Sequence, residues 1–423
     1  MKRIEYPSRS QWNELLQRPV IDTATLQQQV KAVMDVVKQD GDKAVMQFTR
    51  QFDGVQLETL EMTEALINET IQLVPDDLKR AIKQAAHNIR IFHEQQKTPV
   101  EIVETMKGVR CWRKAVGIEK VGLYIPGGTA PLFSTILMLG IPAQIAGCKE
   151  VILCSPPDKN GKLHPAIVYA ANLVGITRIF TIGGVQAIAA MTYGTESVPK
   201  VYKIFGPGNQ YVTCAKQLAQ QDGIAIDMPA GPSEVCVMAD DTANPAFVAA
   251  DLLSQAEHGT DSQVLLVSTD AILVDKVIEE LDVQLAQLSR KEIAAKALTN
   301  SKAIIVKDKN EAIDLVNQYA AEHLIISCED DEQIAEKIIN AGSVFLGNYS
   351  PESVGDYASG TNHTLPTNGF ARAYSGVSVD SFVKKITYQK LSKEGLASIA
   401  PTVVIMAAAE GLDAHKNAVL IRQ

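Results

Sequence analysis

The sequence predicts an α/β protein with two Rossmann-like units, each built on a parallel sheet, facing each other across a cleft. Three observations lead to this prediction. Short apolar segments of strand length alternate with helical segments from about residue 120 to residue 346. Most of these strand segments are apolar nearly throughout, which is typical of parallel strands covered by helices on both faces. A chain of 423 residues also exceeds what one hydrophobic core usually serves.

The N-terminal part is expected to form a short arm followed by helices. Residues 1–21 are polar, and we expect an arm that packs on another part of the protein. Apolar residues recur at helical spacing over residues 23–51, and a second amphipathic helix is expected over residues 76–96. This second helix contains His87 and His93, which are not on one face and are expected at the surface.

Between residues 120 and 221, four strand segments alternate with four helical segments. The strands are expected at residues 120–126, 150–156, 178–183 and 201–205, and the helices at 131–147, 164–175, 185–193 and 209–221. Buried strands separated by helices of this length make one Rossmann-like unit.

A second series of strands follows, at residues 233–239, 263–268, 303–306, 323–327 and 342–346. The helix after the first of them is expected at 244–257, with Gly259 as its C-cap. We expect a first domain of residues 22–124 plus 236–376, which groups the N-terminal helices with this second unit, and an inserted domain of residues 125–235. Two facing units would leave a ligand cleft at the carboxyl ends of their strands.

Regular structure is expected to stop between residues 347 and 376. This segment is rich in turn-forming residues, and a loop of that length in a compact domain is usually functional or disordered. Because Asp356 and His363 lie in it, we favour a functional loop. Residues 377–423 are expected to form a separate, small helical tail.

Composition excludes several classes of protein. A net charge of −9 argues against nucleic acid as a partner. No apolar run reaches the roughly 18–20 residues that span a membrane, and the N-terminus has no apolar core of a signal peptide. The six cysteines are scattered without a C-x-x-C pair, so we expect buried free thiols in a reducing cytoplasm.

Glycines follow three of the strands in the first unit, at Gly127-Gly128, Gly183-Gly184 and Gly206-Pro-Gly208. The G-x-G-x-x-G fingerprint of dinucleotide binding is missing. Glycines before a helix N-terminus let backbone N–H groups approach a phosphate, although each loop alone could be a tight turn. The three loops together leave a nucleotide site and simple turns as open alternatives.

Two pairs of residues could carry chemistry. Gln255 and His258 stand three residues apart on the last turn of their helix, which is half of a metal site. Glu322 and His323 open a strand, and a histidine beside a buried carboxylate makes an acid–base pair suited to neutral pH. For both pairs, an ordinary structural role remains open from the pattern alone.

The chain resembles the L-histidinol dehydrogenase family over nearly its whole length. The resemblance is carried by Gly231-Pro-Ser-Glu-Val, Ser254-Gln-Ala-Glu-His-Gly, Ala321-Glu-His-Leu-Ile-Ile, Gly355-Asp-Tyr-Ala-Ser-Gly-Thr-Asn-His-Thr-Leu-Pro and Glu410-Gly-Leu-Asp-Ala-His. It implies a cytoplasmic enzyme of histidine biosynthesis that oxidises L-histidinol through L-histidinal to L-histidine with two NAD and one Zn²⁺ per site.

Functional residues carry over from the family motifs by position. The resemblance implies Gln255, His258, Asp356 and His415 as metal ligands, with Mn²⁺ or Co²⁺ as plausible replacements for Zn²⁺. The metal would hold the imidazole and amino nitrogens of the substrate. Substrate contacts are further implied for Ser233, His323, His363 and Glu410, and NAD contacts for Tyr124, Gln186 and Asn209.

The resemblance also implies how the reaction and the subunits are organised. His323 would take the alcohol proton, and Glu322 would activate water to attack the aldehyde, giving a gem-diol that His323 deprotonates. The family is a homodimer, so Glu410 and His415 are expected to complete the site of the other subunit.

Three alternatives were weighed against this interpretation. The first is a related metal- and NAD-dependent dehydrogenase of another small polyfunctional alcohol, such as a sulfonated diol. A zinc hydrolase would lack its usual H-E-x-x-H motif, and a binding protein without activity would not be expected to keep Glu322-His323.

Overall fold

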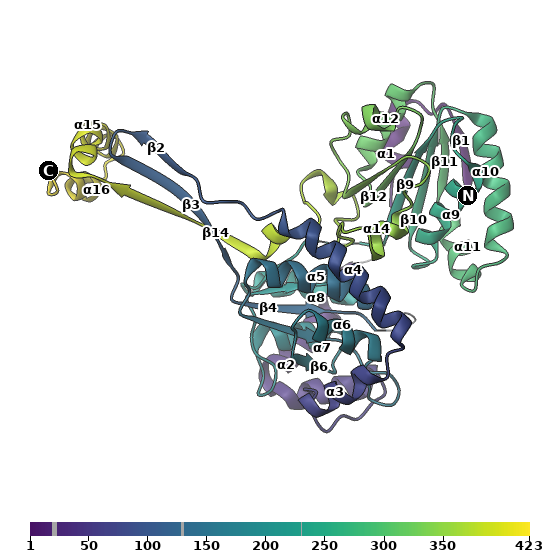
Figure 1. Ribbon diagram of the computed structural model, residues 1–423, viewed down its shortest axis with the longest axis horizontal. Coiled ribbons are helices and arrows are strands. Elements are labelled where there is room, and N and C mark those ends of the chain that lie inside the picture. Colours follow the sequence, from purple (N-terminus) through teal and green to yellow (C-terminus); the bar gives the residue numbers. More distant parts are fainter. Residues whose placement is uncertain (19–22, 128–130, 230) are drawn as a thin grey trace.

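The computed structural model, which describes residues 1–18, 23–127, 131–229 and 231–423, contains two α/β modules and a projecting arm (Figure 1). Each module is built around its own parallel sheet, which confirms the predicted fold class. The last residues of the expected N-terminal arm and Gly128 of the first glycine loop lie outside the described residues. No helix in the described ranges is long and apolar enough to cross a membrane.

The first module has a five-stranded parallel sheet in the order β6-β5-β4-β7-β8. Its strands are β4 (Lys120–Tyr124), β5 (Glu150–Cys154), β6 (Arg178–Phe180), β7 (Lys203–Phe205) and β8 (Ala225–Ile226). The connecting helices are α5 (Phe133–Ala146), α6 (Pro165–Leu173), α7 (Gly184–Tyr193) and α8 (Gln210–Gln221). Most residues of α5–α7 are buried, as expected for helices that cover a parallel sheet.

The N-terminal helices pack on this module and not on the other one, so their expected grouping is wrong. These helices are α2 (Thr23–Phe52, interrupted at Gly41), α3 (Glu64–Gln72) and α4 (Asp76–Glu94). Val30, Met34 and Val37 of α2 share a core with α7 and α8, while α3 and α4 pack on α6 and α5. Sequence order alone does not determine which sheet an amphipathic helix covers. Here α2, α3 and α4 all pack on the helices of the first sheet.

His93 of α4 is fully buried and not at the surface as expected. Its Nδ1 lies 2.8 Å from the carbonyl of Ile89, and its Nε2 lies 3.4 Å from the side-chain nitrogen of Asn362. The helix therefore holds the long segment that follows residue 347.

The second module has a six-stranded parallel sheet in the order β1-β11-β10-β9-β12-β13. Its strands are β1 (Lys2–Glu5), β9 (Glu234–Ala239), β10 (Gln263–Ser268), β11 (Lys302–Ile305), β12 (His323–Ser327) and β13 (Ser343–Leu346). The expected N-terminal arm thus begins as an edge strand. One face is covered by α9 (Pro245–Ala256), α10 (Ala271–Leu285) and α11 (Lys291–Thr299), and the other by α1 (Trp12–Leu15), α12 (Lys309–Tyr319) and α13 (Asp331–Ala335).

A long antiparallel arm projects from the first module (Figure 1). It consists of β2 (Ile102–Met106), β3 (Val109–Gly117) and β14 (Val383–Leu391), with α15 (Lys393–Ala409) and α16 (Asp413–Leu420) at its tip. The expected helical tail is therefore only partly helical. Its first element is the strand β14, which pairs with β3 more than 260 residues earlier in the chain, with Val383 opposite Gly117.

Candidate active site

The two modules enclose a cavity of about 640 Å³ that contains most of the expected site residues. Its walls include Gln255, His258, Glu322, His323 and Asp356 from the second module and Gly206–Gln210 from the first. The first sheet meets the cavity at the carboxyl ends of its strands, as predicted. The second sheet meets it at the amino ends, because Glu234 and His323 begin β9 and β12. The expectation of carboxyl ends is therefore wrong for this sheet.

Glu322 and His323 lie together at this edge and are both buried. Glu322 Oε2 accepts a hydrogen bond from the backbone N–H of Glu234 at 3.0 Å, and burial raises the pKa of Glu322 to about 8. His323 Nδ1 lies 3.3 Å from the carbonyl oxygen of Glu234. Burial alone would lower the pKa of His323, but the carboxylates of Glu322, Asp356 and Glu352 raise it.

Three of the four expected metal ligands meet in the same cavity. Gln255 lies in the last turn of α9, whereas His258 lies two residues beyond the end of this helix, whose C-cap is Glu257 and not Gly259 as expected. Asp356 comes from α14 (Glu352–Tyr357), a short helix within the segment expected to be irregular. Burial lowers the pKa of His258, which favours the neutral imidazole that binds metals. Burial would raise the pKa of Asp356, but His323 and the other imidazoles keep it below its ordinary value.

Two buried polar atoms of this group face each other without a well-formed hydrogen bond. They are Asp356 Oδ1 and His323 Nε2, which lie 3.3 Å apart as an ion pair. Such buried atoms normally have a partner. Together with a donor set of nitrogen and oxygen atoms, they fit a bound divalent metal. Within the described residues, no three or more His, Cys, Asp or Glu side chains are arranged as a ready-made metal site.

Glu352 is a buried carboxylate of the site that the sequence reasoning missed. It is 1% exposed, its Oε1 accepts from Ser254 at 2.7 Å, and its Oε2 lies 3.9 Å from His323 Nδ1. Burial raises its pKa to about 7. With the amide nitrogen turned toward Glu352, Gln255 donates to Oε1 of Glu352 at 3.0 Å, so this carboxylate can orient an expected metal ligand.

Of the residues expected to contact substrate, Ser233 and His363 line the cavity. His363 is hydrogen-bonded between the modules, with Nε2 at 2.9 Å from Thr135 Oγ1 and Nδ1 at 2.7 Å from the carbonyl of Asp356. Glu410 and His415 do not join this cavity. They lie in the helical tip of the arm, away from both sheets (Figure 1).

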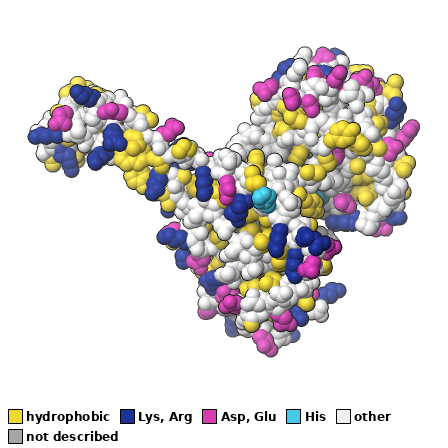
Figure 2. All heavy atoms as spheres, viewed as in Figure 1, with side chains coloured by type: hydrophobic (Ala, Val, Ile, Leu, Met, Phe, Trp, Pro, Cys, Tyr) yellow, Lys and Arg dark blue, Asp and Glu magenta, His cyan; other side chains and the backbone are white. Residues whose placement is uncertain are grey.

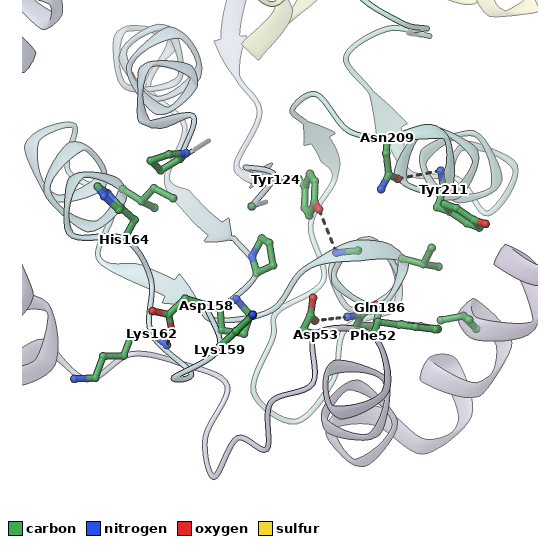
Figure 3. Close-up of a pocket in the computed structure, with 18 of the residues that line it drawn as sticks. Phe52, Asp53, Tyr124, Asp158, Lys159, Lys162, His164, Gln186, Asn209 and Tyr211 are labelled. Carbon is green, nitrogen blue, oxygen red and sulfur yellow. Dashed lines mark hydrogen bonds between the residues drawn. The ribbon is translucent and has the colours of Figure 1, made fainter. Parts of the chain in front are cut away.

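A second cavity, of about 890 Å³, lies at the carboxyl ends of the first sheet and holds the three residues expected to contact NAD. Figure 3 shows Tyr124, Gln186 and Asn209 around it, with Asp158, Lys159, Lys162 and His164 along another side. The Tyr124 hydroxyl accepts a hydrogen bond from Gly184 N at 3.1 Å, and Asn209 caps α8. Asn209 also lines the first cavity, so this residue is shared by both.

Asp53 is a second residue that sequence reasoning missed. It follows α2 and faces the NAD-side cavity, where Gln186 Nε2 donates to its carboxylate at 3.3 Å (Figure 3). Burial raises the pKa of Asp53 to about 6. The sequence contained only one signal for it, the Asp-Gly pair that ends the helix.

Comparisons with known proteins agree with one another. The family model for histidinol dehydrogenase matches residues 16–423. The histidinol dehydrogenase of Bacteroides fragilis (strain YCH46) is 62% identical over 422 residues, covering 100% of this chain and 99% of that protein. That of Yersinia pestis is 53% identical, covering 98% and 94%. A crystal structure of histidinol dehydrogenase from Elizabethkingia anophelis superposes with a TM-score of 0.98 at 56% identity, covering 100% and 98%.

Proposed function

Because the chain belongs to the histidinol dehydrogenase family, we propose that it oxidises L-histidinol through L-histidinal to L-histidine, using Zn²⁺ and two NAD, in the cytoplasm. The observation that carries this proposal is the buried Glu322–His323 pair, which shares one cavity with Gln255, His258 and Asp356. A cytoplasmic location is supported by the six cysteines, all of which are free.

Gln255, His258 and Asp356 would hold the metal, with His415 of the partner subunit as the fourth ligand. A bound Zn²⁺ supplies a Lewis acid that fixes and orients the amino and imidazole nitrogens of the substrate. The unpartnered Asp356 Oδ1 supports this assignment. Ser233 and His363 line the remaining wall, where they can contact the substrate.

His323 and Glu322 would divide the proton transfers between them. His323 Nδ1 faces the carbonyl of Glu234, so Nε2, which lies 3.3 Å from Asp356 Oδ1, is the nitrogen proposed to take the proton of the substrate alcohol. Glu322, whose pKa burial raises to about 8, can take a proton from water as this attacks the aldehyde carbon. His323 then deprotonates the resulting gem-diol. Each of the two oxidations delivers one hydride, for which NAD is the acceptor.

The second cavity is the proposed NAD site. Tyr124 ends β4, whereas Gln186 and Asn209 follow β6 and β7, so all three supply polar groups at the carboxyl edge of the first sheet, where α8 has its N-terminus. Asp53 can accept hydrogen bonds from ribose hydroxyl groups. Because Asn209 lines both cavities, the nicotinamide is proposed to approach the substrate from this side.

The proposed active form is a homodimer in which each arm completes the site of the partner. Hydrophobic side chains gather along the arm (Figure 2), including Ile102, Val103, Ile386 and Tyr388, all at least 38% exposed. At the tip, Ile405, Met406 and Ile421 are exposed by 59% to 80%. Apolar surface of this kind supports association, and a second copy would bring Glu410 and His415 to the cavity that holds Gln255, His258 and Asp356.

The test measures NADH formed per L-histidinol consumed by the purified protein, with and without a chelator. Two NADH per histidinol, abolished by the chelator and restored by Zn²⁺, is the expected result. One NADH with free aldehyde would contradict the role of Glu322. No NADH from histidinol, but NADH from another small polyfunctional alcohol such as a sulfonated diol, would replace the proposed substrate.

A further inference from the structure

Glu234 lies behind the catalytic pair and contacts both members through its backbone. Its N–H donates to Glu322 Oε2 at 3.0 Å, and its carbonyl oxygen lies 3.3 Å from His323 Nδ1. A carbonyl oxygen can only accept, so this contact favours a proton on Nδ1 of His323. One peptide segment thus sets the position of the carboxylate and the protonated nitrogen of the imidazole.

The backbone of Glu234 is not held by the sheet alone. Glu234 is the first residue of β9, and the chain before it is the turn Gly231-Pro232-Ser233, where Gly231 N donates to the side chain of Thr367. Strand ends fray more easily than strand centres. Contacts of the Glu234 side chain therefore matter for where this peptide lies.

Arg18 holds that side chain with a two-point ion pair. Its Nε donates to Glu234 Oε2 at 2.5 Å and one terminal nitrogen donates to Oε1 at 2.9 Å, while the same nitrogen donates to the carbonyl of Tyr319 at 2.7 Å. The guanidinium carbon lies 4.2 Å from the centre of the Tyr319 ring. The Arg18 and Glu234 side chains are 13% and 2% exposed, so water screens this pair little.

We propose that Arg18 is a positioning residue for catalysis, which acts through Glu234 to hold Glu322 and His323 in their working geometry. The inference rests on the proposed function for the roles of the catalytic pair. Arg18 itself contacts neither of these two residues. It stands after α1, near the point where the chain leaves the second module for α2 on the first.

The geometry requires the planar fork of arginine. A lysine carries one ammonium group, which can replace the charge but not two parallel hydrogen bonds together with the contact to Tyr319. Arg18→Met, which removes the charge and all donors but keeps an apolar stem, leaves the Glu234 carboxylate buried without its cation. The Glu234 carboxylate then keeps only weaker contacts, such as the Tyr319 hydroxyl at 3.5 Å, so its backbone can shift. A shift of about 1 Å in a catalytic group can lower the rate about 100-fold.

The first experiment compares kcat and KM of Arg18→Met and Arg18→Lys with those of the unmodified protein. The kcat of Arg18→Met should be about 10- to 100-fold lower than that of the unmodified protein. The kcat of Arg18→Lys should lie between those of Arg18→Met and the unmodified protein. The KM for NAD should change less than about twofold, because the NAD cavity is built mainly on the first sheet. NADH formed per histidinol should fall below the unmodified value, since a displaced Glu322 activates water poorly.

Lys309→Met is the matched control at the opposite end of the same strand. Lys309 pairs with Asp240, which follows β9, at 3.2 Å and with Asp330 at 2.5 Å. Losing this cation should lower the unfolding temperature without changing kcat or the NADH ratio. If Lys309→Met lowers kcat as Arg18→Met does, the effect of Arg18 is one of general stability and the inference is wrong.

A crystal structure of Arg18→Met gives a readout that does not depend on activity. The distance from Glu234 N to Glu322 Oε2, 3.0 Å here, should lengthen beyond hydrogen-bonding range. An unmoved Glu234 overturns the inference, whatever the kinetics. If the unmodified protein makes no NADH from histidinol, the proposed function fails, while this distance still decides whether Arg18 positions the pair.

Discussion

Asp53 is a partly buried carboxylate in the proposed NAD site. Its protonation state should therefore affect how tightly the cofactor binds. Burial raises the pKa of Asp53 to about 6. Above that pH the side chain is a carboxylate that accepts hydrogen bonds from ribose hydroxyls, and below it the side chain is a neutral acid. The KM for NAD should therefore rise as pH falls through about 6. Asp53→Asn should show a higher KM at pH 8 and lose this inflection.

The control for Asp53 is Glu58→Gln, which removes an exposed carboxylate close by in the chain. Its KM for NAD should follow the unmodified pH dependence. If Asp53→Asn also follows that dependence, another group is responsible and Asp53 does not contact the cofactor.

Glu322 is expected to matter most in the second oxidation, because only that step needs an activated water. Glu322→Gln keeps the shape and an acceptor for Glu234 N but removes the base. The rate of histidinal oxidation should fall about 10²- to 10⁴-fold, as for loss of a general base, with a smaller effect on histidinol oxidation. The ratio of NADH to histidinol should approach one, and aldehyde should be trapped by a carbonyl reagent. Glu329→Gln, at the exposed far end of β12, should leave the ratio unchanged.

At the scale of elements, the turn after β7 requires glycine because both its backbone conformation and its close packing exclude a side chain. Gly206 has a φ of 126°, and a Cβ there would lie 1.9 Å from the carbonyl oxygen of Tyr124. Gly223, after α8, also has a positive φ of 87° but open space around it. Gly223→Ala should cost about 1–2 kcal/mol of unfolding free energy from backbone strain. Gly206→Ala should cost clearly more and raise the KM for NAD, as chemical unfolding and kinetics would show. Equal losses would mean that the contact with Tyr124 is relieved without consequence.

Elements were predictable from the sequence where burial imposes a pattern. The central strands of both sheets and the helices that cover them follow this rule, because they are largely buried. The edge strands β1 and β8 are partly exposed and were not predicted. The strands β2 and β14 are exposed along nearly their whole length, so no alternation of burial marks them within one subunit. The proposed dimer would cover these strands, but the sequence of a single chain does not show this.

The site divides in the same way. Gln255 and His258 could be placed on one helix face by spacing, and Glu322-His323 by adjacency. The sequence could also have predicted which edge of the sheet they occupy. Because α9 connects the parallel strands β9 and β10, its last turn must lie near the amino end of β10. Glu352 and Asp53 could not be predicted, because a carboxylate gains its role from three-dimensional burial and partners distant in sequence, such as Ser254 and Gln186.

At the scale of the whole molecule, the position of the arm makes the proposed dimer testable by complementation. The cavity holds His323, whereas His415 lies at the arm tip (Figure 1). His323→Ala and His415→Ala should each be inactive alone. In a hybrid dimer, one site combines both defects and the other has none. Equal mixing followed by subunit exchange should therefore restore about a quarter of the unmodified activity, since about half of the dimers are hybrids with one intact site.

The control for this experiment is a mixture of His323→Ala with Glu322→Gln, two defects in the same half of the site. Every site in such hybrids carries one defect, so activity should stay at the level of the separate variants. If the mixture of His323→Ala and His415→Ala also stays inactive, although mass measurements show hybrids, each arm serves its own subunit. The chain would then need a large rearrangement of β2, β3 and β14 to bring His415 to Asp356, which a change in the distance between labels on α16 and α9 would detect.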